Sequence, residues 1–229
     1  MMWIKICGIT NKDDAITAMR SGVDAIGLNF FRGSKRYVTP AVAAEIVQAV
    51  RSEASGASPD FVGVFVNSAA DEIVQIVRDV QLDAVQFHGE ESEQLIQSVH
   101  QQIPDVALIR ATRISAERLE ESLQELETLA KRIPLSACLL DAYVAGEYGG
   151  TGHQLGANLA AALRNRVPSR FILAGGLKAD NVARAIRTFE PWGVDTASGV
   201  EISPGCKDAD LMQSFIREAR GDRTGNVRL

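Results

Sequence analysis

The chain of 229 residues contains few cysteines and histidines, and their spacing argues against the usual disulfide and metal frameworks. Its three cysteines, Cys7, Cys138 and Cys206, are scattered and odd in number, which argues against a disulfide framework and favours a reducing compartment. No C-x-x-C pair or H-E-x-x-H helix occurs, and the three histidines lie far apart. We therefore expect no metal site and a cytoplasmic location.

The chain also lacks long apolar runs and any excess of basic residues. No stretch approaches the roughly 20 apolar residues of a membrane span, and the first residues lack the features of a signal peptide. The net charge of -5 and the pI near 5.3 argue against nucleic acid as a partner. With 46% hydrophobic and 23% charged residues, the composition is that of an ordinary globular protein.

What the sequence does contain is an alternation of strand-like and helix-like segments. The strand-like runs cover residues 3–7, 24–30, 61–66, 83–87, 106–109, 137–140, 171–174 and 193–197. After each run, apolar residues recur at helical spacing. This alternation predicts a parallel sheet, and eight units in 229 residues predict a single (β/α)8 TIM barrel. An open doubly wound sheet would instead need a G-x-G-x-x-G turn after the first strand, which is absent.

The ends of several predicted helices carry recognisable signals. The expected helix starts are Thr10 or Asn11, Thr39 before Pro40, Asn67 with Ser68, and Ser115. The sixth helix is expected around Leu155, Leu159 and Leu163. We expect residues 1–220 to form the barrel and residues 221–229 to be a polar, disordered tail.

In a parallel barrel the carboxyl ends of all strands meet at one mouth, where such enzymes hold their substrates. The polar residues at or near these ends are Cys7, Asn29, Arg36, Gln86, His88, Arg110, Asp141 and Ser198. Cys7 at a glycine turn and Asp141 after an apolar strand are the candidates for chemistry. As alternatives, Cys7 could be a packed apolar residue and Asp141 could cap a loop.

The other candidates have equally open interpretations. Arg36 could bind a carboxylate with its planar fork or be a solvated surface charge. His88 could contact substrate or form a structural hydrogen bond. Lys5 shares the strand face of Cys7, with Asp195 as a potential charge partner, and we interpret that pair as structural.

Two glycine turns follow the seventh and eighth strands. Gly175 and Gly176 come after the seventh strand, and Ser198 and Gly199 come after the eighth. In barrels these loops often form a phosphate site, because glycine lets backbone N–H groups approach an anion. Their occurrence at both positions predicts a phosphorylated small molecule as the ligand.

Taken together, these residues resemble the phosphoribosylanthranilate isomerase family of tryptophan biosynthesis. The matching stretches are residues 5–10 (KICGIT), 34–38 (SKRYV), 63–67 (GVFVN), 85–91 (VQFHGEE), 139–141 (LLD), 148–152 (YGGTG), 174–177 (AGGL), 194–201 (VDTASGVE) and 204–208 (PGCKD). They cover the whole chain apart from its tail, and the first and last stretches are highly specific when found together.

The resemblance implies a cofactor-independent aldose–ketose isomerase, an intramolecular oxidoreductase. Its reaction would be the Amadori rearrangement of N-(5-phosphoribosyl)anthranilate to 1-(2-carboxyphenylamino)-1-deoxyribulose 5-phosphate. By resemblance, the general base is Cys7, the general acid is Asp141, and Arg36 contacts the anthranilate carboxylate. The phosphate would be held by Gly175, Gly176, Ser198 and Gly199, with His88, Gly150 and Gly152 as further candidate substrate contacts. We expect N–H groups of the turn at Gly8 and of the helix after Thr10 to favour the Cys7 thiolate.

Two alternatives remain beside that interpretation. A different phosphate-handling barrel, such as a sugar-phosphate epimerase or the indole-forming synthase of the same pathway, would need metal-binding aspartates and histidines or a lysine with glutamates, and neither set can be assembled. A phosphometabolite-binding barrel without activity would not need Cys7 and Asp141. No long apolar stripe is left after the helices face the barrel, so we expect a monomer.

Overall fold

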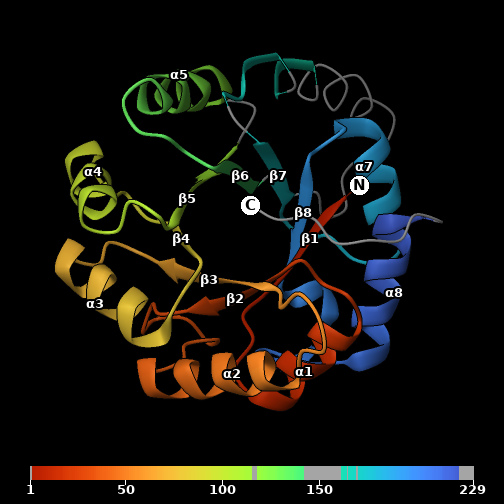
Figure 1. Cartoon of the computed structure of the whole chain (residues 1–229). Helices are drawn as coiled ribbons and strands as arrows, with labels where there is room; N and C mark the ends of the chain where they lie inside the picture. The colour runs from red at the N-terminus through yellow and green to blue at the C-terminus, as the bar shows by residue number, and fades with distance from the viewer. Residues whose placement is uncertain (1, 115–117, 142–160, 164, 169, 222–229) are drawn as a thin grey trace.

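The computed structural model describes residues 2–114, 118–141, 161–163, 165–168 and 170–221. Eight parallel strands pair in sequential order and close into a barrel, and the described helices surround it (Figure 1). The strands are β1 (Trp3–Cys7), β2 (Ala25–Asn29), β3 (Asp60–Phe65), β4 (Ala84–Phe87), β5 (Ala107–Arg113), β6 (Ala137–Asp141), β7 (Arg170–Ala174) and β8 (Gly193–Thr196). The helices are α1 (Lys12–Arg20), α2 (Pro40–Glu53), α3 (Ala70–Val80), α4 (Glu93–Gln102), α5 (Leu119–Ala130), α7 (Val182–Phe189) and α8 (Ala209–Arg220). The predicted (β/α)8 barrel is confirmed.

Successive residues of a strand belong to two different cores. In β1, Ile4 and Ile6 belong to the apolar layer between sheet and helices, whereas Trp3 belongs to the cluster inside the barrel. Both layers are buried, which explains why the strands are apolar on both faces. Inside the barrel, the Trp3 and Trp192 rings stack with centroids 5.2 Å apart. The opposite end of β1, at Cys7, is therefore the end from which a ligand can enter.

The observed helix N-caps agree with the sequence predictions at α1 and α2 but not at α3. The side chain of Asn11 accepts a hydrogen bond from Asp14 N at 2.9 Å, and Thr39 caps α2 with Pro40 in its first turn, as predicted. The helix α3 is present, but its predicted N-cap at Asn67 and Ser68 is wrong, because Ala69 occupies that position without a side-chain hydrogen bond. Asn67 instead adopts a left-handed backbone (φ 53°) and accepts a bond from Glu90 N at 2.7 Å.

The ends of α5 and β5 differ from the predicted ends by several residues. α5 begins at Leu119, after the predicted start at Ser115, which lies outside the described residues. β5 continues to Arg113, beyond the predicted end at residue 109. The predicted start of the sixth helix and, apart from Gly221, the predicted tail also lie outside the described residues. In the part of the chain that the structure describes, no helix is long and apolar enough to cross a membrane.

A hairpin after β8 was not predicted. A 3₁₀ turn, η1 (Ser198–Val200), leads into the antiparallel strands β9 (Glu201–Ser203) and β10 (Cys206–Lys207). The turn between them contains Gly205, whose φ of +85° suits glycine. The hairpin is tied to the loop after β1 and to α1, because Thr10 Oγ1 donates to Gly205 O at 2.6 Å and Lys207 N donates to Asp14 Oδ2 at 3.0 Å.

Candidate active site

One cavity of about 390 Å³ lies at the carboxyl ends of the strands. The predicted site residues that line it are Cys7, Arg36, His88, Asp141, Gly175, Gly176 and Ser198. Gly199 is not among the described residues that line it, and Gly150 and Gly152 fall outside the described residues. Residues from six different segments, up to 191 positions apart along the chain from Cys7 to Ser198 (198 − 7), thus meet around one space.

Cys7 ends β1 against the backbone of β2. A Cβ on Gly27 would come within 2.7 Å of Cys7 Sγ, so the glycine is what makes room for the sulfur. The expected role of the turn at Gly8 is wrong. Gly8 N and Ile9 N both donate to Gly27 O, at 2.9 and 3.2 Å, and are therefore occupied by the barrel backbone rather than by the thiol.

Charged side chains surround the thiol instead. Lys5 is fully buried, and its Nζ donates to Asp195 Oδ1 at 3.0 Å, which confirms the predicted contact. Burial alone would lower the pKa of Lys5, but Asp195 and Cys7 raise it above its usual value, so Lys5 is an ammonium ion. Burial raises the pKa of the Cys7 thiol, and the positive charges of Lys5 and Lys207 oppose that effect.

Asp141 is the last residue of β6 and is half-buried at the mouth. In the closed barrel, β7 and β8 lie between β6 and β1. The loops that follow β7 and β8 therefore lie between Asp141 and Cys7. A ligand held by those loops would have a carboxyl group on one flank and a thiol on the other.

The turn after β7 is built on glycine. Gly175 and Gly176 have φ values of 102° and 65°, which side-chain-bearing residues rarely adopt. The side chain of Asn181 fixes the turn, because it accepts from Lys178 N at 2.8 Å and donates to Gly176 O at 3.0 Å. The turn is thus a defined shape that brings backbone close to the cavity.

The loop after β8 packs directly on that turn. Thr196 Oγ1 donates to Leu177 O at 2.8 Å, and a Cβ on Gly199 would come within 1.9 Å of the same carbonyl oxygen. Only glycine at position 199 lets the two loops come this close. Gly199 therefore shapes the predicted phosphate site by packing.

His88 and Gln86 form a polar pair on β4 and its exit. Gln86 Nε2 lies 2.8 Å from His88 Nδ1, while the buried Gln86 Oε1 has no hydrogen-bond partner among the residues that the structure describes. Burial, helped by the charge of Lys5, lowers the pKa of His88, so its imidazole is neutral at pH 7. A neutral imidazole and an unpaired amide oxygen are suited to the hydroxyl groups of a ligand.

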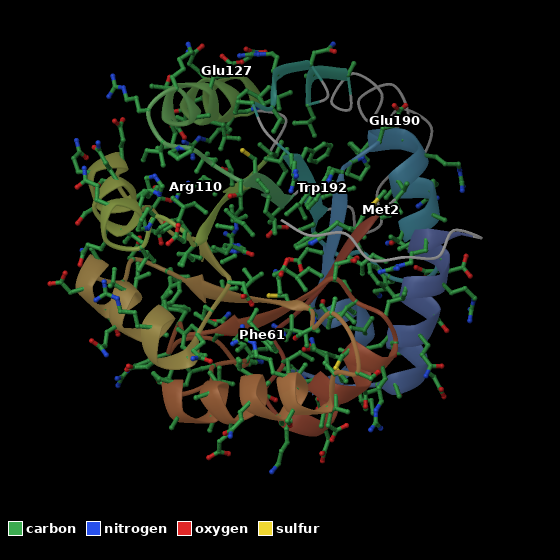
Figure 2. All side chains as sticks on the ribbon, viewed as in Figure 1. Met2, Phe61, Arg110, Glu127, Glu190 and Trp192 are labelled. Atoms are coloured by element: carbon green, nitrogen blue, oxygen red, sulfur yellow. The ribbon has the colours of Figure 1, made fainter. Side chains whose placement is uncertain are left out.

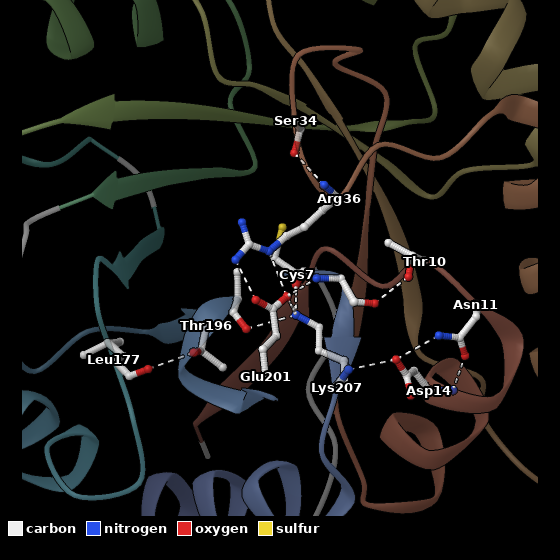
Figure 3. Close-up of polar contacts among 12 residues, drawn as sticks. Cys7, Thr10, Asn11, Asp14, Ser34, Arg36, Leu177, Thr196, Glu201 and Lys207 are labelled. Atoms are coloured by element: carbon white, nitrogen blue, oxygen red, sulfur yellow. Dashed lines mark hydrogen bonds and ion pairs between the residues drawn. The ribbon is translucent and has the colours of Figure 1, made fainter. Parts of the chain in front are cut away.

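Arg36 is held by a residue that the sequence did not single out. Its Nε and Nη2 donate to the two carboxylate oxygens of Glu201 at 2.8 and 2.6 Å, and Lys207 Nζ donates to Glu201 Oε1 at 2.8 Å (Figure 3). Arg36 Nη1 forms no hydrogen bond with another described residue. The sequence signal for this network was the Pro204–Gly205 dipeptide, a strong turn marker that predicts a hairpin after Glu201.

Arg110 does not belong to the mouth. Because β5 extends to Arg113, Arg110 lies within the strand and alternates to its outer face, where Nη1 donates to Glu91 Oε2 at 2.6 Å. Figure 2 shows Arg110 between β5 and the helices α4 and α5. A second cavity, of about 440 Å³, lies on this outer side, and Arg110 is the only one of the predicted mouth residues among the described residues that line it.

Among the residues that the structure describes, no three His, Cys, Asp or Glu side chains are grouped to hold a metal ion. The groups around the cavity that could transfer protons include Cys7 and Asp141, and those that could bind an anion include Arg36 and the glycine loops.

Comparison with known proteins gives full-length matches. A family model for N-(5'-phosphoribosyl)anthranilate (PRA) isomerase matches residues 4–218. The N-(5'-phosphoribosyl)anthranilate isomerase of Trichlorobacter lovleyi is 40% identical over 223 residues, which cover 96% of this chain and 98% of the relative. A crystal structure of a phosphoribosyl anthranilate isomerase in complex with reduced 1-(o-carboxyphenylamino)-1-deoxyribulose 5-phosphate is similar with a TM-score of 0.80 and 36% identity, covering 96% of this chain and 100% of that one.

A second solved structure shows monomers generated from the dimeric phosphoribosylanthranilate isomerase of Thermotoga maritima. It is similar with a TM-score of 0.79 and 34% identity, and covers 96% of this chain and 100% of that one. The residues matched by the family model include the barrel strands, from Ile4 in β1 onward, and the hairpin that holds Arg36.

Proposed function

Because the chain belongs to the phosphoribosylanthranilate isomerase family of tryptophan biosynthesis, we propose that Cys7 and Asp141 carry out the two proton transfers of that isomerisation. The reaction is the Amadori rearrangement of N-(5'-phosphoribosyl)anthranilate to 1-(2-carboxyphenylamino)-1-deoxyribulose 5-phosphate. No atom is gained or lost, so proton movements within the substrate are sufficient and we propose that no cofactor is needed.

The chemistry needs an acid and a base on different sides of the sugar. Asp141 protonates the oxygen of the furanose ring, the ring C–O bond breaks, and the anthranilate nitrogen supplies the electron pair that forms an iminium. Cys7 then removes the proton from C2 of the sugar, and the resulting enolamine tautomerises to the ketone. Dividing the work between a carboxylic acid and a thiolate suits the separate positions of β6 and β1.

Binding groups are arranged to hold the substrate between these two residues. In this proposal the phosphate binds at the turn of Gly175 and Gly176 and at the loop of Ser198, where backbone N–H groups can approach an anion. Arg36 binds the anthranilate carboxylate. His88, as a neutral imidazole, contacts a hydroxyl group of the substrate.

The observation that supports this proposal best is that Cys7, Arg36, Asp141 and the first glycine turn line one cavity of about 390 Å³. The volume is within the range of sites for small organic ligands. We further propose that the enzyme acts in the cytoplasm, that residues 1–220 are its catalytic domain, and that residues 221–229 are a tail outside it.

The proposal is tested with Cys7→Ala and Asp141→Asn, using the fluorescence of the anthranilate substrate to follow turnover. We expect each variant to lose about 10²–10⁴-fold in kcat, and to keep its affinity for the reduced product bound in the comparison structure. Cys206→Ala is the matched control, because Cys206 is exposed on β10 and does not line the cavity. Turnover by Cys7→Ala at the rate of this control would remove Cys7 from its role.

A further inference from the structure

Two residues of the hairpin form a buried ion cluster with Arg36. Glu201 Oε1 accepts from Arg36 Nε, from Lys207 Nζ and from Gly205 N, and Oε2 accepts from Arg36 Nη2 at 2.6 Å. The side chain of Glu201 is 4% exposed and that of Lys207 is fully buried. The side chain of Arg36 is 24% exposed, and Arg36 is the member of the cluster that lines the cavity.

Lys207 must be charged in this arrangement. Its Nζ donates to Cys7 O at 2.7 Å, to Ala197 O at 2.9 Å and to Glu201 Oε1 at 2.8 Å (Figure 3). All three partners are acceptors, so the nitrogen needs three hydrogens, which only the ammonium form has. Burial lowers the pKa of Lys207, and the carboxylate of Glu201 opposes that effect.

The net charge of the cluster determines how strongly it attracts a carboxylate ligand at Arg36. Arg36 and Glu201 alone form a neutral ion pair, whose attraction for a further carboxylate is weak. With Lys207 the cluster holds two cations and one anion, and its net charge is +1. In a site shielded from water this extra charge is felt strongly, because little solvent screens it.

Orientation is the second contribution. The bidentate bond to Glu201 uses the Nε and Nη2 groups of Arg36 and fixes the plane of the guanidinium. Nη1 forms no hydrogen bond to another described residue, so it remains for a ligand in the cavity. Lys207 also holds the carbonyl groups of Cys7 and Ala197, and thereby ties the carboxyl ends of β1 and β8 to the same cluster.

We propose that Lys207 and Glu201 are positioning residues that keep Arg36 both oriented and net cationic toward the aromatic carboxylate of the substrate. This rests on the proposed function, in which Arg36 binds that carboxylate. Neither hairpin residue lines the cavity, so their effect on the carboxylate of the substrate is exerted through Arg36.

The test compares two ligands by isothermal titration calorimetry. One is the reduced product, 1-(o-carboxyphenylamino)-1-deoxyribulose 5-phosphate in its reduced form, and the other is the same molecule without the carboxyl group. The ratio of their dissociation constants measures the preference for the carboxylate. A general loss of folding or of phosphate affinity weakens both ligands and leaves this ratio unchanged.

Lys207→Met removes the extra charge and should reduce the preference roughly tenfold, as expected for loss of a charge-assisted contact. Lys207→Gln, which retains hydrogen-bond donors but no charge, should reduce it similarly and replaces Lys207→Met if that variant does not fold. The double variant Lys207→Met with Glu201→Gln leaves Arg36 as the single charge, so the net charge returns to +1. The preference should therefore recover at least in part, whereas a merely structural cluster predicts a further loss.

Two reference variants separate the possible failures. Arg36→Met should abolish the preference, and if it does not, the proposed role of Arg36 itself is wrong. If Arg36→Met abolishes the preference while the Lys207 variants retain it, or if the double variant is worse than Lys207→Met, only the positioning proposal is overturned. Lys131→Met, an exposed lysine at the end of α5, should leave the ratio at its original value.

Discussion

Cys7 is a thiol whose surroundings act in opposite directions. Burial favours the neutral thiol, whereas the ammonium groups of Lys5 and Lys207 favour the thiolate that a general base requires. Of the two lysines, Lys5 has the larger effect on the pKa of Cys7. The Lys5 and Cys7 side chains lie beside the same point of β2, because a Cβ on Gly27 would come within 3.0 Å of Lys5 Cε and 2.7 Å of Cys7 Sγ. The Lys5–Asp195 pair, whose sequence positions suggest only a structural role, therefore also sets the electrostatics of the proposed base.

Replacing Lys5 by Met should raise the pKa of the Cys7 thiol further, because the first charge that opposes burial is lost. The rate of alkylation by iodoacetamide follows the thiolate fraction, so its pH profile should move to higher pH. The measurement uses a Cys206→Ser background and mass spectrometry to identify the modified residue. Lys5→Met with Asp195→Asn should shift the profile less, since the opposing carboxylate is also removed. An unshifted profile in Lys5→Met would contradict this account.

His88 gives a stability prediction whose sign is set by its depressed pKa. Burial, with the charge of Lys5, keeps the imidazole neutral in the folded state, whereas in the unfolded chain it gains a proton near about pH 6.5. The unfolded state therefore binds more protons in this window, so the contribution is present above pH 6.5 and is lost as pH falls below it. Urea unfolding between pH 5 and 8 should show a shallower acid decline in His88→Gln. Equal pH slopes for the two proteins would contradict the assignment.

At the scale of elements, the two loops after β7 and β8 form one unit through Thr196. Thr196→Val keeps the side-chain shape but leaves Leu177 O without its 2.8 Å hydrogen bond. We expect a loss of about 1–3 kcal/mol in the free energy of unfolding and weaker competitive inhibition by inorganic phosphate. Thr128→Val is the control, because the Thr128 hydroxyl donates to Gln124 O in an exposed setting. Unaltered phosphate inhibition in Thr196→Val would show that the loops hold their shape independently.

The sequence predicted correctly the elements whose start or pattern depends on residues close together in the chain. Strand β1 follows from its apolar alternation, and α2 follows from Thr39 and Pro40. The errors concern residues with distant partners. The sequence predicts Asn67 as a helix N-cap, but its side chain instead accepts a hydrogen bond from the N–H group of Glu90, in the loop after β4. No local pattern could reveal that hydrogen bond.

In the candidate site, too, features set by nearby residues could be predicted and features set by distant residues could not. That Cys7 and Asp141 end strands could be predicted, because the end of an apolar run is visible in the sequence. That Arg110 faces outward could not, since it depends on β5 extending to Arg113. The bond of Arg36 to Glu201 joins residues 165 positions apart, and only closure of the whole barrel brings them together.

For the whole molecule, the closed barrel and the rather few exposed apolar side chains bear on assembly. A closed sheet has no free edge for another chain to join. In the described part of the chain, the large exposed hydrophobic residues are Phe31, Val42, Ile202 and Leu211. They come from four separate segments, namely the loop after β2, α2, β9 and α8.

We therefore predict that the protein is a monomer at micromolar concentration. Stable dimers generally bury more than about 1,200 Å² with an apolar centre, which four side chains on separate segments do not readily supply. The net charge of -5 adds a weak repulsion between copies. Size-exclusion chromatography with light scattering should give a mass near 24.7 kDa. The same mass should persist in high salt, where the repulsion is screened. A mass twice as large at either salt concentration would mean that a surface other than these four side chains forms an interface.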